Sequence, residues 1–293
     1  MLVRIAPRAE RQADENLGFG LPETGMSRFG WSYYGTFRKC KRAWAFKYGP
    51  GKHDKPPRRA PGPRDIGTAV HAGLAAHYLG KMGRMAMRPH DAVAAAGSRL
   101  SMTGHQIHRA QGAAQAYVRA FASEPFDPMH VEEEFWISFG PEWGGAGDGE
   151  VPYTARLDVI LRARGSGRIF IVDHKTGIQP DNATLDAYAL HGQLHGQHWI
   201  GKLTWGERFG GVLVAQVQSD TPFRINRVPP PPAPLLLASF PRSIRNTAAE
   251  IAWWTEINGP DPLAYDGVMQ ETVCRGRYGF CDFREPCTGG TFR

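Results

Sequence analysis

The chain has 293 residues, of which 42% are hydrophobic and 22% are charged. This composition is typical of a globular protein, and the length suits one large domain or two small ones. No stretch approaches the roughly 18 apolar residues of a membrane-spanning helix, the first residues show no secretory signal, and the few cysteines exclude a disulfide-dense scaffold. We therefore expect no membrane association and a cytoplasmic location.

The positive charge is concentrated in one segment. The net charge is +7, yet the stretch from Arg38 to Arg64 alone carries +9, from ten Lys and Arg residues and a single acid, Asp54. A local field of this strength attracts polyanions, of which nucleic acid is the commonest. A solubilising basic loop would have the same composition. The residues of this segment that we predict to contact DNA are Arg38, Lys39, Lys41 and Arg42.

The first part of the chain is predicted to be mainly helical, because its apolar and aromatic residues recur at helical spacing. In chain order, we predict a flexible arm at 1–26, one or two short helices at 27–48 starting at Ser32, a loop at 49–64, a helix at 65–79 capped by Asp65, and helical structure at 89–122.

The remainder alternates strands with helices. In chain order, we predict strands at 131–139, 153–161 and 169–175, a helix at 184–203, strands at 211–218 and 223–228, a stiff connector at 229–234, and a helix to about residue 257. Helices around a small set of strands indicate an α/β or α+β domain with a C-terminal appendage.

An acid and a lysine lie together near the end of an apolar strand. Asp173 and Lys175 share one face of strand 169–175, because strand side chains alternate. A two-residue turn at Gly165-Ser166 would place Asp158 directly opposite Asp173, whereas a three-residue turn would put it on the other face unless a bulge corrected it. Two carboxylates this close need a proton or a cation between them, and oxygen ligands favour Mg²⁺ or Mn²⁺.

These groups suit phosphodiester hydrolysis. Metal ions held by carboxylates neutralise the scissile phosphate and activate water, and a nearby lysine can orient or deprotonate that water. A surface Lys–Asp ion pair would show the same short motif, so the pair alone does not decide between the two interpretations.

The order of several motifs along the chain is more specific. An aromatic and basic opening at 32–44 precedes His71, Asp158, the Asp173-His-Lys175 triplet and Gln193. In this order and spacing the sequence resembles the RecB-like branch of the PD-(D/E)XK nucleases, especially phage-type exonucleases and CRISPR-associated RecB-like nucleases. The resemblance runs from about residue 27 to residue 287.

The resemblance implies a role for each matching residue. His71, Asp158 and Asp173 match the Mg²⁺ or Mn²⁺ ligands, Lys175 matches the catalytic lysine, and Gln193 matches a glutamine that contacts the site or substrate. The family often has a tyrosine four residues after this glutamine, where this chain has Gln197.

The resemblance also implies an architecture. It is an α/β fold with a restriction-endonuclease-like core, in which helices flank a central mixed sheet, and it ends in a C-terminal cysteine-rich clasp. We predict an N-terminal arm at 1–26, a nuclease domain at 27–260 with a helical insertion at about 65–125, and a cluster-binding segment at 261–293 that closes onto Cys40.

Two further groups of residues could bind metal. His191, His195 and His198 follow helical spacing and could form a zinc site, although histidines are also common on solvated helix faces. Four cysteines are candidates for one shared site: Cys40, Cys274, Cys281 and Cys287. Four thiolates can hold a 4Fe–4S cluster or a structural Zn²⁺. Iron–sulfur members of the resembled family share the arrangement of one early and three late cysteines, so the resemblance implies the cluster.

These features together predict a metal-dependent DNA nuclease. We expect an exonuclease that acts on DNA ends or single strands in phage or bacterial recombination or repair, in the bacterial cytoplasm or, if phage-encoded, in that of the host. The alternatives are a CRISPR-adaptation nuclease that trims spacer precursors, a DNA-binding protein with a silent centre and a zinc-stabilised interaction module. Recombination or CRISPR proteins are possible partners, and the sequence does not determine the oligomeric state.

Overall fold

The computed structural model describes residues 4–5, 27–51, 60–177, 180–267, 274–276 and 279–288. The longer helices among these residues are α1 (Trp31–Lys39), α2 (Lys41–Tyr48), α3 (Pro63–Lys81), α4 (Pro89–Arg99), α5 (Gly104–Ala120), α6 (Asn182–Ala189), α7 (Gly192–Trp205) and α8 (Pro234–Asn258). The strands of the main sheet are β1 (Arg4–Ile5), β2 (Phe126–Phe139), β3 (Val151–Ala163), β4 (Ile169–Gly177), β5 (Phe209–Gln218) and β6 (Ile225–Val228). Within these ranges, no helix has the length and apolar character needed to cross a membrane.

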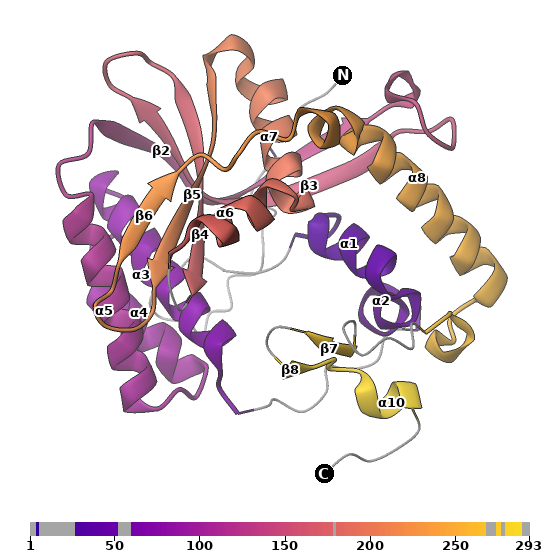
Figure 1. Cartoon of the computed structure of the whole chain (residues 1–293), viewed down its shortest axis with the longest axis horizontal. Coiled ribbons are helices and arrows are strands. Elements are labelled where there is room, and N and C mark those ends of the chain that lie inside the picture. Colours follow the sequence, from indigo (N-terminus) through magenta and orange to yellow (C-terminus); the bar gives the residue numbers. More distant parts are fainter. Residues whose placement is uncertain are drawn as a thin grey trace.

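The main sheet is mixed, with its strands in the order of the chain (Figure 1). All neighbouring strands are antiparallel except β4 and β5, which are parallel and joined through α6 and α7. The fourteen-residue β2 and the thirteen-residue β3 form the longest pair. This arrangement confirms the predicted α/β class.

Each face of the sheet has its own hydrophobic core. One face packs against α1, α7 and α8 through residues such as Phe37, Ile200 and Ile244. The opposite face packs against α3, α4 and α5 through residues such as Val70 and Ala114. The helices of the second face fall within the range predicted as an insertion, while the domain boundaries themselves remain predictions.

The α3 helix begins two residues earlier than predicted. Pro63 takes the first helical position, where its missing N–H is not needed. Asp65 is therefore the third helical residue and not the cap, and it accepts a 2.8 Å hydrogen bond from the backbone N–H of Gly62. Asp65 thus lies at this end of the helix, three positions after the cap, which is the position that the sequence predicts for it.

Two predicted helical stretches are interrupted. The stretch 89–122 divides into α4 and α5, because Ser101 has a φ of 56° and Thr103 caps α5 through the backbone N–H of Gln106. The predicted helix 184–203 divides into α6 and α7, with the break at Leu190 and His191. Such breaks change the direction of the second helix, so residues at helical spacing in the sequence need not lie on one helix face in the structure.

The C-terminal segment returns to the beginning of the described chain. A short hairpin of β7 (Arg275–Gly276) and β8 (Gly279–Phe280) precedes the α10 helix (Arg284–Thr288), and Figure 1 shows these elements next to α1 and α2. The backbone N–H of Arg42 donates to the carbonyl of Asp266, and its side chain reaches Cys287. The predicted arm at 1–26 lies outside the described residues apart from β1.

Candidate active site

The pairing of β3 with β4 has the register that the sequence predicted. Val159 pairs with Val172, and the ladder continues to Arg162 and Ile169. The turn is wider than the predicted Gly165-Ser166 pair, because the backbone hydrogen bond that closes it joins Ala163 and Arg168. Asp158 and Asp173 would form the next pair of this ladder, so the same register brings both acids to one end of it.

A distortion in β2 and β3 shapes the site at this end. Glu132 has a φ of 51°, in the left-handed region, and it lies between two regular pairs of the β2–β3 ladder, Val131 with Val159 and Glu133 with Leu157. The alternation of faces changes at this point, since Leu157 packs in the α1, α7 and α8 core and Val159 packs in the opposite one. Glu132 and Asp158 lie opposite each other between these two pairs, so the distortion falls where the two acids meet.

Three side chains converge here as metal ligands would. One ligand atom from each of His71, Glu132 and Asp158 lies within 4.8 Å of the other two. His71 comes from α3, and its Nε2 is 3.0 Å from the carbonyl oxygen of His174. Because a carbonyl only accepts, Nε2 carries the proton and the lone pair is on Nδ1, which lies 3.6 Å from Asp158 Oδ2. This is the tautomer that a histidine ligand needs.

The two carboxylates have opposite electrostatic environments. Burial alone would raise the pKa of Asp158, but His71, His174 and Lys175 together hold it below its ordinary value. Burial raises the pKa of Glu132 well above its usual range, and the negative charges of Asp158 and Asp173 raise it further. Glu132 resists ionisation because it is buried and because ionised Asp158 lies beside it. A cation bound between the two carboxylates would remove this repulsion.

Asp173 has a different set of partners. Its Oδ2 lies 2.7 Å from Lys175 Nζ, and its Oδ1 accepts hydrogen bonds of 2.9 Å from Gln193 and 2.8 Å from Gln197. Lys175 also donates to Gln193 Oε1 at 3.1 Å. Asp173 is not part of the group of three described above, so its predicted role as a metal ligand remains a prediction. Asp173 and Asp158 together raise the pKa of Lys175 above its ordinary value, against the effect of burial.

Sequence reasoning missed two residues of this site. Glu132 stands in a run of three glutamates, and nothing in the run distinguishes the one whose backbone is distorted. Gln197 was noted only as a departure from the resembled family, yet it is buried and donates to Asp173. Its spacing of four residues from Gln193 on α7 was the available signal, because that spacing puts both amides on one helix face.

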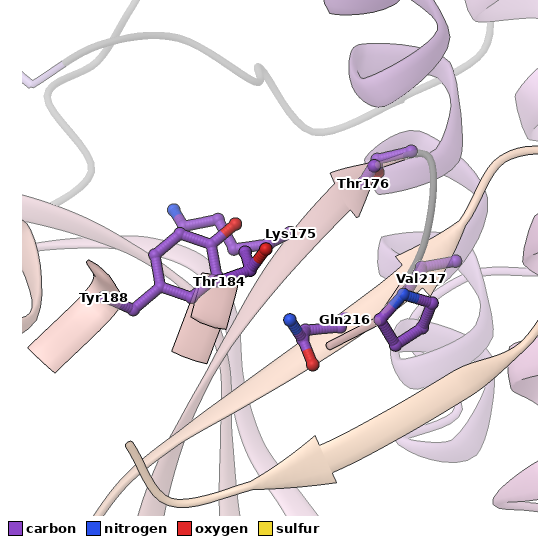
Figure 2. A pocket seen from close by; sticks show the side chains of 8 residues that line it. Lys175, Thr176, Thr184, Tyr188, Gln216 and Val217 are labelled. Atoms are coloured by element: carbon purple, nitrogen blue, oxygen red, sulfur yellow. The ribbon is translucent and has the colours of Figure 1, made fainter. Parts of the chain in front are cut away.

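A hollow adjoins Lys175 on the outer side of the site. Figure 2 shows Lys175 reaching from β4 toward Thr184 and Tyr188 of α6, with Gln216 of β5 on the other side. Gln216 is held by the carbonyl oxygen of Asp181, which accepts a 3.2 Å hydrogen bond from its amide. Among the described residues, Lys175 thus contacts the carboxylate of Asp173 and also lines this small polar hollow.

The three histidines proposed as a zinc site do not converge. Among the described residues, their ligand atoms form no group within 4.8 Å of one another. His191 lies at the cap of α7 next to Trp31, His195 bonds to the carbonyl of Ala189, and His198 packs on Phe209. That alternative is wrong because the break between α6 and α7 removes His191 from the helical face.

The four predicted DNA contacts occupy two kinds of position. Arg38 and Lys39 are exposed at the end of α1. Lys41 instead lies 3.0 Å from Glu250 of α8 and over the ring of Trp254. Arg42 donates to the carbonyl oxygens of Tyr265, Leu263 and Cys287.

The cysteines lie where the two ends of the described chain meet, although among the described residues no three of their sulfur atoms lie within 4.8 Å of one another. Cys40 joins α1 to α2, and the carbonyl of Cys274 accepts a 2.7 Å hydrogen bond from the N–H of Cys281. Burial raises the pKa of the Cys281 thiol, and negative charge on Cys40 and Cys274 raises it further. The fourth thiol, Cys287, has its Sγ 3.6 Å from Arg42 Nη1.

Comparisons with known proteins identify the family of the chain. A family model described as the PD-(D/E)XK nuclease superfamily matches residues 28–288. Among solved structures, the chain is similar to one described as "Crystal structure of SSO0001", with 11% identity, a TM-score of 0.36, and coverage of 78% of this chain and 86% of that chain. A likeness at this level has no bearing on the site, and the curated proteins include no match. Because the family model spans most of the chain, and the sheet with its flanking helices has the restriction-endonuclease-like arrangement, the chain belongs to the PD-(D/E)XK nuclease superfamily.

Proposed function

We propose that this protein is a metal-dependent DNA exonuclease of the RecB-like branch, which acts on DNA ends or single strands during recombination or repair in the cytoplasm of a bacterium or phage host. The observation that carries the proposal is the convergence of His71, Glu132 and Asp158 beside the Asp173–Lys175 pair. The segment with a charge of +9 supports a polyanionic substrate.

The donor set fits a hard divalent cation. Two carboxylates and an imidazole with its lone pair on Nδ1 would hold the ion, with Asp173 as a further proposed ligand. Mg²⁺ or Mn²⁺ bound there would neutralise charge on the scissile phosphate and lower the pKa of a coordinated water.

Lys175 and Gln193 act next to this group. The raised pKa of Lys175 keeps its side chain as an ammonium ion, so we assign it to orienting water and stabilising developing negative charge. Gln193 bonds to both Lys175 and Asp173 and thereby fixes their separation. A small polar hollow lies next to Lys175, and we propose that a phosphate oxygen of the substrate approaches the ammonium group from this side (Figure 2).

The second part of the proposal concerns the cysteines. We propose that Cys40, Cys274, Cys281 and Cys287 hold a 4Fe–4S cluster that ties α1 and α2 to the C-terminal segment. The contact of Arg42 with Cys287 and the influence of Cys40 and Cys274 on Cys281 support one shared site. Metal-binding free energy would then contribute to folding.

The catalytic proposal is tested with linear and covalently closed DNA, each single- and double-stranded, in Mn²⁺, Mg²⁺ or EDTA. We expect cleavage only of linear DNA and only with metal. Asp158→Asn, Asp173→Asn and Lys175→Ala should each lower the rate by a factor on the order of 10², because each removes several kcal/mol of transition-state stabilisation.

The matched control is Asp148→Asn, which changes an exposed carboxylate of the β2–β3 loop and should leave the rate unchanged. Cleavage of closed circles would contradict the exonuclease assignment. Wild-type activity in Lys175→Ala would contradict the site, and DNA binding without any cleavage would indicate a silent centre.

A further inference from the structure

A buried polar network lies next to Asp158, on the side of the sheet covered by α3, α4 and α5. Starting at Asp158, it consists of His174, Tyr117, Tyr78, Arg227, Glu124 and Lys81. Tyr78 and Tyr117 are fully buried, and Glu124 is only 7% exposed. The proposed reaction uses none of these groups beyond Asp158.

The two contacts nearest the site involve the same oxygen of Asp158. The backbone N–H of His174 donates to Asp158 Oδ2 at 2.7 Å, and His174 Nδ1 lies 3.4 Å from the same oxygen. On the far side of the ring, His174 Nε2 is 3.1 Å from the hydroxyl of Tyr117. One histidine thus joins the carboxylate of Asp158 to a tyrosine of α5.

The direction of the hydrogen bonds follows from what each group can donate. Nδ1 is the ring nitrogen that faces the carboxylate of Asp158, so we assign the ring proton of His174 to Nδ1, and Nε2 then accepts from the Tyr117 hydroxyl. Arg227 only donates, and its Nη1 lies 3.3 Å from the Tyr117 oxygen and 3.2 Å from that of Tyr78. The network therefore has one polarity, from Arg227 through Tyr117 and His174 to Asp158.

The far end of the network is anchored in β6, in α3 and in the loop between α5 and β2. Arg227 of β6 is 2.6 Å from Glu124, and Glu124 is 3.1 Å from Lys81 of α3. Figure 1 shows α3 and α5 packed beside β6 on this side of the sheet. A buried ion pair adds little net stability compared with well-packed apolar residues, so stability alone does not account for this arrangement.

We propose that Tyr117 is a positioning residue, which orients the His174 ring and through it holds Asp158 Oδ2 in place for the metal. The inference rests on the metal site proposed above. Partners that orient metal ligands commonly change metal affinity by about 10- to 100-fold. Tyr78 contacts Tyr117 and Arg227 but donates nothing to His174, so it provides the comparison.

The test compares Tyr117→Phe with Tyr78→Phe in the full-length chain. Each variant removes one buried hydroxyl and keeps the aromatic ring. Mn²⁺ affinity is measured without DNA by electron paramagnetic resonance of the free ion, and the Mn²⁺ concentration for half-maximal cleavage is measured separately. We expect Tyr117→Phe to weaken both by about 10-fold, with DNA affinity unchanged, while Tyr78→Phe remains near wild type.

Thermal unfolding of both variants separates positioning from loss of structure, because the two should lose similar stability. Wild-type Mn²⁺ affinity in Tyr117→Phe, or an equal loss in Tyr78→Phe, would overturn the proposal. Asp158→Asn serves as the reference. If Asp158→Asn retained wild-type Mn²⁺ affinity, the proposed metal site would be wrong. If Asp158→Asn lost Mn²⁺ affinity while Tyr117→Phe kept it, only the positioning role of Tyr117 would be refuted.

Discussion

At the scale of single residues, the site depends on groups whose charges would repel without a counter-ion. Glu132 and Asp158 lie within reach of one ion, and the pKa of Glu132 is raised by burial and by its acidic neighbours. The neighbours of Asp158 act in the other direction and keep it ionised. Asp158 is therefore ionised without a metal, whereas ionisation of Glu132 becomes favourable when a cation binds.

His77, a partly buried residue of α3, should make the stability of the protein depend on pH. Burial lowers the pKa of His77 to about 4, and its Nε2 has no hydrogen-bond partner among the described residues. The unfolded chain, with a histidine pKa of about 6.5, binds more protons than the folded protein below that pH. This contribution to stability is complete above about pH 6.5 and is lost as the pH falls toward 4.

We therefore expect the Tm in EDTA to fall between about pH 7 and pH 5, and His77→Phe to reduce that fall. The fall should not vanish, because burial also lowers the pKa of His174. The control is His105→Phe, the same substitution at an exposed position of α5, which should leave the slope unchanged. Equal slopes in wild type and His77→Phe would contradict the prediction.

Some of the residue-level site could be predicted, and some could not. The β3–β4 register is the one that the sequence predicts for a two-residue turn at Gly165-Ser166, because the wider turn observed at 164–167 has the same centre. The sequence alone did not exclude the other register. The position of Glu132 depends on a positive φ in the middle of β2, which no local pattern signals for a glutamate. Gln197 acquires its role only from the approach of α7 to Asp173, a tertiary contact.

At the scale of elements, sequence patterns located the helices and strands but not their breaks. The interruption between α6 and α7 falls at Leu190 and His191, where the backbone of His191 is extended, although the apolar and polar pattern continues without a change. The basic residues of α1 and α2 likewise follow one another in the sequence but have two different environments. Arg38 and Lys39 face outward, while Lys41 and Arg42 hold α8 and the C-terminal segment.

This division predicts two classes of variant. Arg38→Ala/Lys39→Ala should weaken binding of single-stranded DNA and flatten its salt dependence by about 0.7 per lost phosphate contact. Lys41→Ala/Arg42→Ala should mainly lower the Tm. Fluorescence anisotropy across a salt series in EDTA measures the slope without cleavage.

The control for this series is Arg84→Ala/Arg119→Ala, which removes two exposed charges elsewhere on the helical layer. It should leave the slope close to wild type. An unchanged slope in Arg38→Ala/Lys39→Ala would place the DNA path away from the end of α1.

At the scale of the whole molecule, the chain closes on itself. Arg42 is hydrogen-bonded to residues more than 220 positions later, including Tyr265 and Cys287, and Cys40 lies at the same joint. The sequence indicated this closure only through the resemblance, because spacing within the chain says nothing about contacts between its ends. A metal group shared by all four cysteines would make the joint a covalent one.

The last prediction tests that shared group. Anaerobically purified protein should be brown, with about four iron atoms and four acid-labile sulfides per chain. Cys40→Ser and Cys281→Ser should each lose the colour, lower the Tm and expose the C-terminal segment to protease to the same extent, since both would break one site. Lys39→Ala, which changes the exposed neighbour of Cys40, should keep the iron. If the protein were colourless and held one zinc ion per chain, the shared metal site would stand but the cluster would be refuted. If Cys40→Ser kept its full iron content and a protected C-terminal segment, Cys40 would not share a site with the late cysteines.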